Sequence, residues 1–91
     1  MEPYASHTTS EVQSVIFKKN KMNPRQCVDW LYEHGFKYNK IDEKENYYRF
    51  RQTNPNKYTH YTTKEIDKKK GIKLILGWYP ISFMGKPFFK R

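Results

Sequence analysis

The sequence predicts an α+β domain in which one helix packs on a small antiparallel sheet, with the elements in the order β-α-β-β-β. Residues 23–36 carry the start and stop signals of a helix. Residues 12–17, 46–52, 58–66 and 72–79 are rich in β-branched and aromatic side chains, as strands are. Short turns separate the last three strands, and we therefore expect those strands to form an antiparallel meander.

The predicted helix, residues 23–36, begins at a capping box. Asn23 can accept from free N–H groups of the first turn, Pro24 suits the first helical position, and Gln26 completes the box. Gly35 can take the left-handed conformation that ends a helix. Four residues at i, i+3, i+4 and i+7 define the apolar face that should meet the sheet: Cys27, Trp30, Leu31 and His34.

The strands alternate in a way that assigns their faces. Residues 12–17 form a first strand, and a basic turn, residues 18–22, leads into the helix. Residues 37–45 are a charged connection with room for a short strand near residues 38–41. In residues 46–52, Tyr48, Phe50 and Gln52 should point one way and Tyr47, Arg49 and Arg51 the other. The helix should cover one face of the sheet and leave the other partly open.

Length and charge limit the functional classes. Ninety-one residues make one domain, which we place at residues 12–79 between an extended arm, residues 1–11, and an irregular tail, residues 80–91. The net charge of +9 predicts attraction to nucleic acid, an anionic surface or an acidic protein. A single Cys excludes an internal disulfide framework. No apolar run reaches the ~20 residues of a membrane span, and the N-terminus lacks signal-peptide features, so we expect no secretion.

One combination of residues resembles a known domain. It runs through Trp30-Leu31, His34-Gly35-Phe36-Lys37, Asp42-Glu43, Asn46, Tyr48-Arg49-Phe50-Arg51-Gln52, and Gly71-Ile72 to Gly77. This pattern is similar to a short uncharacterised domain found in bacteriophage and large DNA virus proteins, and it covers residues 12–77. The resemblance implies a viral setting and a β/α fold, and it implies no mechanism.

The first candidate site is the row Tyr47, Arg49 and Arg51. Guanidinium groups beside an aromatic ring suit a nucleic-acid backbone with a stacked base. The alternative is a solvated strand face whose arginines pair with Glu65 or Asp67 across the sheet, because the two-residue period of a strand produces such rows by itself.

The second candidate is a pair of lysine clusters in two turns. If the first strand lies beside the last, these clusters should adjoin at one end of the sheet and contact phosphate or an anionic surface. The alternative is that they only keep the chain soluble and discourage edge pairing. The residues are Lys18, Lys19, Lys21, Lys68, Lys69 and Lys70.

The third candidate is Cys27 with His34. Seven residues separate them by about 10 Å along a helix, too far for joint metal binding within that helix. We therefore expect a buried Cys and a packed His. The sequence contains no glycine-rich phosphate loop, zinc-ligand cluster or supported carboxylate pair, so we expect neither an enzyme nor a cofactor.

The fourth candidate is the tail, whose apolar residues should not remain in water. Either it folds back over its own sheet or it docks on another protein. Its docking residues would be Ile81, Phe83, Met84, Phe88 and Phe89.

The leading hypothesis is a non-enzymatic structural protein of a virus particle, a minor capsid component that bridges larger capsid proteins through its arm and tail. In this reading its positive charge faces acidic coat surfaces or the packaged genome. The second is an accessory protein that binds DNA or RNA, and a distant third is an inhibitor of a host protein. These hypotheses place the chain in a virion or in the host cytoplasm.

Overall fold

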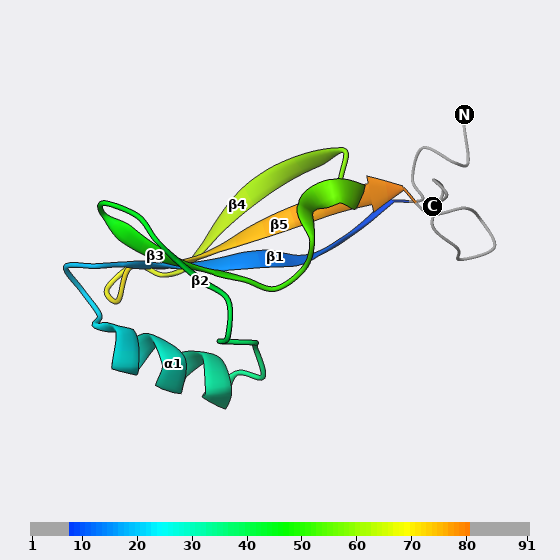
Figure 1. Ribbon diagram of the computed structural model, residues 1–91. Helices are drawn as coiled ribbons and strands as arrows, with labels where there is room; N and C mark the ends of the chain where they lie inside the picture. Colours follow the sequence, from blue (N-terminus) through cyan, green and yellow to red (C-terminus); the bar gives the residue numbers. More distant parts are fainter. Residues whose placement is uncertain (1–7, 81–91) are drawn as a thin grey trace.

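The computed structural model describes residues 8–80, which form one α-helix and one five-stranded antiparallel sheet (Figure 1). This confirms the predicted α+β class and element order. Within these residues no helix is long and apolar enough to cross a bilayer. The elements are β1 (Thr8–Lys18), α1 (Pro24–Glu33), β2 (Ile41–Glu43), β3 (Tyr47–Arg51), the 3-10 helix η2 (Pro55–Lys57), β4 (His60–Asp67) and β5 (Ile72–Pro80).

Helix α1 forms for the local reasons that the sequence supplies. Asn23 Oδ1 accepts from the Gln26 amide at 2.8 Å, and Gln26 Oε1 accepts from the Asn23 amide at 2.9 Å, which completes the capping box. The helix ends at Glu33, because Gly35 takes φ +78° and the Phe36 amide donates back to the Leu31 carbonyl at 2.8 Å.

The strand order is β2-β3-β1-β5-β4, which corrects the predicted meander. The β4–β5 hairpin forms, but β3 pairs with β1 instead of β4. In this order Phe17 of β1 lies opposite Tyr48 on one side and Ile72 on the other. β1, which supplies the buried Val15 and Phe17, thus gains neighbours on both sides, and a meander would not surround it in this way.

The core lies between α1 and one face of the sheet. Phe17 contacts Trp30 and Phe50 edge-on, with ring centroids 5.6 Å apart in both pairs. The opposite face has no α-helix over it, and the short η2 segment lies on that side near the far end of β5 (Figure 1). The buried apolar residues are Val15, Phe17, Met22, Cys27, Leu31, Phe50 and Ile72.

Several predicted segments have other boundaries in the structure. Residues 8–11 of the predicted arm belong to β1, and β5 extends to Pro80. The short strand expected near residues 38–41 lies instead at Ile41–Glu43, where it pairs with β3. Residues 1–7 of the arm and residues 81–91 of the tail lie outside the described part.

A bulge at Gln13 interrupts the register between β1 and β5. Val12 still packs against the core, whereas Gln13 and Ser14 both have no exposed surface. Ser14 alternates with the core residue Val15 and so points away from the helix, and its hydroxyl donates to Gln13 Oε1 on the same side at 2.7 Å. The bulge therefore places two neighbouring buried polar side chains, Gln13 and Ser14, on the sheet face opposite α1.

Candidate nucleic-acid interface

Two lysine-rich turns lie side by side at one end of the sheet. Because β1 pairs with β5, the turn that follows β1 meets the turn that precedes β5, and the Lys18 amide donates to the Gly71 carbonyl at 3.0 Å. The expectation that the two clusters adjoin is confirmed. We call their lysines and one from β5 the basic rim: Lys18, Lys19, Lys21, Lys68, Lys69, Lys70 and Lys73.

Gly71 lets the two turns approach closely. Its φ is +69°, and a Cβ built there would lie 2.8 Å from the Cβ of Lys18. Any other residue would therefore be strained and would also push the two turns apart.

Lys73 is a rim residue that sequence reasoning missed. It lies opposite Ile16 in the register, on the face away from the helix, between Ile72 and Leu74 on the helix side. The signal was present in the alternation of β5, where one charged residue interrupts an apolar run.

A hollow of about 460 Å³ lies between the basic rim and β3. Lys18, Lys19 and Lys73 supply its positive charge, and Tyr47 supplies an aromatic wall. Glu45 is the one carboxylate among its lining residues. The hollow can therefore accept an anionic group beside a planar ring.

Lys19 is the rim residue with the strongest ties to the rest of the protein. Its Nζ lies 2.9 Å from Glu43 Oε2 and 5.3 Å from the centre of the Tyr48 ring. These contacts offset part of its charge. The exposed lysines of the rim are therefore more available to a ligand than Lys19, and they include all three lysines of the β4–β5 turn.

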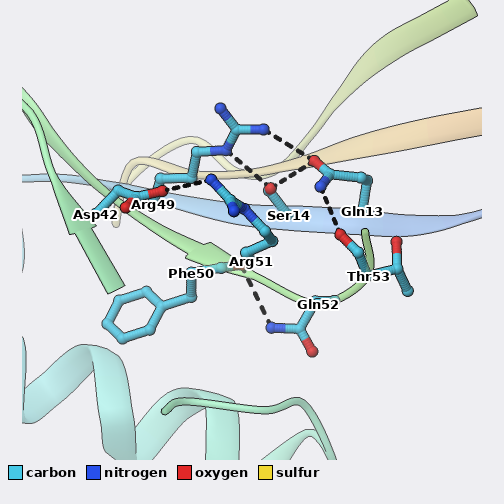
Figure 2. Close-up of polar contacts among 8 residues, drawn as sticks. All are labelled: Gln13, Ser14, Asp42, Arg49, Phe50, Arg51, Gln52 and Thr53. Carbon is cyan, nitrogen blue, oxygen red and sulfur yellow. Dashed lines mark hydrogen bonds and ion pairs between the residues drawn. The ribbon is translucent and has the colours of Figure 1, made fainter. Parts of the chain in front are cut away.

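Arg49 of the predicted row is held by the buried polar pair of the bulge. Its Nε donates to Ser14 Oγ and its Nη2 donates to Gln13 Oε1, each at 2.9 Å (Figure 2). Gln13 Nε2 in turn donates to the Thr53 carbonyl at 2.7 Å. Arg49 therefore has a structural task, because it satisfies two buried oxygen atoms that would otherwise lack part of their hydrogen bonding.

Arg51 forms an ion pair, but not with the predicted partners. Its Nη2 lies 3.1 Å from Asp42 Oδ2 of β2 (Figure 2). The expected pairing with Glu65 or Asp67 is wrong for both arginines, because β4 lies at the far edge of the sheet from β3. The row still shares one face, but of its three residues only Tyr47 lines the hollow beside the basic rim.

Cys27 and His34 do not form a site. Burial raises the pKa of the Cys27 thiol to about 11, which suppresses the reactive thiolate. His34 is exposed and does not pack into the core, contrary to expectation. Its ring stacks on the Trp30 ring with 3.8 Å between the ring centroids, and its Nδ1 lies 2.8 Å from the Trp30 carbonyl oxygen. Among residues 8–80, no three His, Cys, Asp or Glu side chains are grouped to hold a metal ion.

Tyr58 covers part of the sheet face opposite α1, at the end far from the basic rim. Its ring lies against Gly77, and its hydroxyl donates to Glu11 Oε2 at 2.6 Å and is hydrogen-bonded to Thr53 Oγ1. Burial, followed by the hydrogen bond to Glu11, raises the pKa of Tyr58 to about 12. The neutral phenol thus anchors the connection that crosses from β3 to β4.

We expect the free energy of unfolding to fall as the pH rises from 10 to about 12, the unperturbed and folded pKa values of Tyr58. The folded state holds the phenol proton more tightly than the unfolded state, so this stabilisation is complete below pH 10 and is lost above it. Urea titrations across the range would measure the change. Tyr58→Phe cannot ionise, and equal pH dependence of the two proteins would contradict the expectation.

Comparisons with family models, curated proteins and solved structures find no match to this chain. The resemblance to a viral domain therefore remains a prediction.

Proposed function

We propose that this is a non-enzymatic protein that binds nucleic acid through the basic rim. The observation that supports this most is the position of β1 between β3 and β5, which brings the two lysine turns together and places Lys18, Lys73 and Tyr47 around one hollow. Lysine ammonium groups neutralise backbone phosphates and release their counterions, which is a sequence-independent source of affinity. The burial of Cys27 and its raised pKa also favour a binding role over a catalytic one.

The aromatic wall favours a single strand over an acidic protein surface. Tyr47 is half-buried and forms one side of the hollow, and Arg49 follows it on the same face of β3. Single-strand sites combine a cationic groove with rings on which bases stack. An acidic protein would use the lysines but would have no need of the ring.

The virion-component hypothesis rests on other residues. It depends on the arm, residues 1–11, and the tail, residues 80–91, of which only residues 8–11 and Pro80 belong to the described part. The predicted docking residues all lie outside it: Ile81, Phe83, Met84, Phe88 and Phe89. The hypothesis remains a prediction, as do the viral setting and the proposed location in a virion or host cytoplasm. A nucleic-acid-binding rim is compatible with it, since a minor capsid protein can face the packaged genome.

The rim is tested by the salt dependence of binding to a labelled single-stranded oligonucleotide. We expect the combined change of Lys68, Lys69 and Lys70 to Gln to reduce the slope of log K against log salt by about 2, because each lost phosphate contact on a single strand removes about 0.7. Fluorescence anisotropy at several salt concentrations measures the slope.

Arg25→Gln is the matched control, because Arg25 is an exposed cation of α1 outside the rim. It should leave the slope almost unchanged. A triple variant whose slope matches that of the wild type, or of the Arg25 control, would overturn the proposal and favour the structural role.

A further inference from the structure

A second cationic hollow lies at the opposite end of β3 from the basic rim. It has a volume of about 370 Å³ and is lined by residues from two segments, 37–40 and 51–55. Three of its lining residues are cations, Lys37, Lys40 and Arg51, and none is a carboxylate. Asn39 and Asn54 add side-chain amides. The local composition is therefore suited to an anion that also accepts several hydrogen bonds.

Hydrogen bonds hold the walls of this hollow in place. The side-chain amide of Gln52 accepts from the Lys37 amide and donates to the Lys37 carbonyl, both at 2.8 Å. The Arg51 amide donates to the Lys40 carbonyl at 3.0 Å. Both lysines are tied through their backbones, so their side chains stay available for a ligand. A pre-formed site loses less conformational entropy on binding.

Arg51 has donor capacity that the described part of the protein leaves unused. One guanidinium nitrogen, Nη2, pairs with Asp42, and Figure 2 shows the group beside this carboxylate above β3. Its Nε is buried and has no hydrogen-bond partner among residues 8–80. The Arg51 side chain as a whole is 41% exposed, so the accessible part of its guanidinium group can meet a phosphate oxygen, which is a strong acceptor for guanidinium groups.

We propose that this hollow binds the terminal phosphate of a nucleotide. Lys37 and Lys40, with Arg51 whose charge Asp42 partly offsets, give the hollow about two positive charges, and this matches a phosphomonoester of charge about −1.5 to −2 at pH 7 better than a singly charged backbone diester. The chemistry is shared by a free mononucleotide and by the phosphorylated end of a strand. None of the three cations belongs to the basic rim, so this site can exist whether or not the rim binds nucleic acid.

The first test compares ligands. In ¹H–¹⁵N NMR titrations, a nucleoside 5′-monophosphate should shift the amide signals of Lys37, Lys40 and Arg51 and the Arg51 Nε–H signal, whereas the nucleoside should not. The affinity should rise as the pH increases through about 6, where the phosphate gains its second charge. Equal responses to nucleoside and nucleotide would overturn the proposal.

The second test distinguishes the two sources of phosphate. The wild type should bind a 5′- or 3′-phosphorylated oligonucleotide at least about tenfold more tightly than the unphosphorylated strand if the site takes a strand end. A nucleotide response without any such preference would support the site and assign it to free nucleotides. Absence of both effects would overturn it.

Variants separate this site from the rim. Lys37→Gln and Lys40→Gln should each weaken nucleotide binding about tenfold, and neither removes the backbone bonds that hold the walls. The control is Lys64→Gln, because Lys64 is exposed on β4 at the other edge of the sheet. The rim triple variant should keep its nucleotide response. Equal losses in the Lys64 and Lys40 variants would overturn the site without affecting the case for the rim.

Discussion

The Phe17→Ala variant is expected to lose about 3–5 kcal/mol of its free energy of unfolding. Phe17 has no exposed surface and lies on the central strand of the sheet. Its ring contacts Trp30 of α1 and Phe50 of β3 at the same centroid distance of 5.6 Å. Removing it opens a cavity at the point where the helix meets the sheet. Small domains have only about 5–15 kcal/mol of stability in total, so a large share would be lost.

Urea unfolding followed by circular dichroism would measure this loss. Trp30→Ala is the informative comparison, because Trp30 belongs to the same aromatic contact but keeps part of its surface exposed. Its loss should be smaller than that of Phe17→Ala. Tyr32→Ala is the neutral control, since Tyr32 is 72% exposed. A larger effect at Trp30 than at Phe17 would mean that the core is centred on the helix and not on β1.

The Gly77→Ala variant is expected to lose about 1–3 kcal/mol, or more, by overpacking. A Cβ built at Gly77 would lie 2.5 Å from two ring atoms of Tyr58. The obstacle is a rigid ring whose hydroxyl is fixed to Glu11, so it cannot swing away without breaking that hydrogen bond. The chain between β3 and β4 would have to move with it.

A double-mutant cycle isolates this contact. In the Tyr58→Ala background the ring is gone, and Gly77→Ala should then cost much less than in the wild type. The coupling should fall within the usual 0.5–3 kcal/mol for residues in contact. Thr63→Ala, on an exposed position of β4, is the control background and should leave the cost of Gly77→Ala unchanged. Equal costs in all three backgrounds would contradict the contact.

The helix was the most predictable element, because its signals are local. Asn23 and Gln26, three residues apart, form the two hydrogen bonds of the capping box, and Gly35 ends the helix through its own backbone conformation. The apolar period placed Cys27 and Leu31 in the core. The same period also placed His34 on the apolar face, but His34 is exposed. A period predicts the direction of a side chain from the helix axis. It does not predict how far the sheet extends beneath the last turn of the helix.

The candidate site was predictable in its parts. The lysines of the two turns were visible as charge clusters, and Tyr47, Arg49 and Arg51 as one face of a strand. The contacts of the two arginines could not be predicted, because Gln13 and Asp42 come close to them only when β3 pairs with β1 and β2. The bulge at Gln13 was not predicted, because the residues around it carry no turn or glycine signal.

By itself, the sequence determined the helix, the β4–β5 hairpin, the alternation of each strand and the excess of positive charge. These depend on neighbours within a few residues or on composition alone. Only the tertiary structure decided that β1 lies at the centre of the sheet, because strand order depends on which apolar faces fit together across the whole chain. That choice brings the two lysine turns into contact. The wider three-dimensional arrangement also builds the second hollow from segments 37–40 and 51–55.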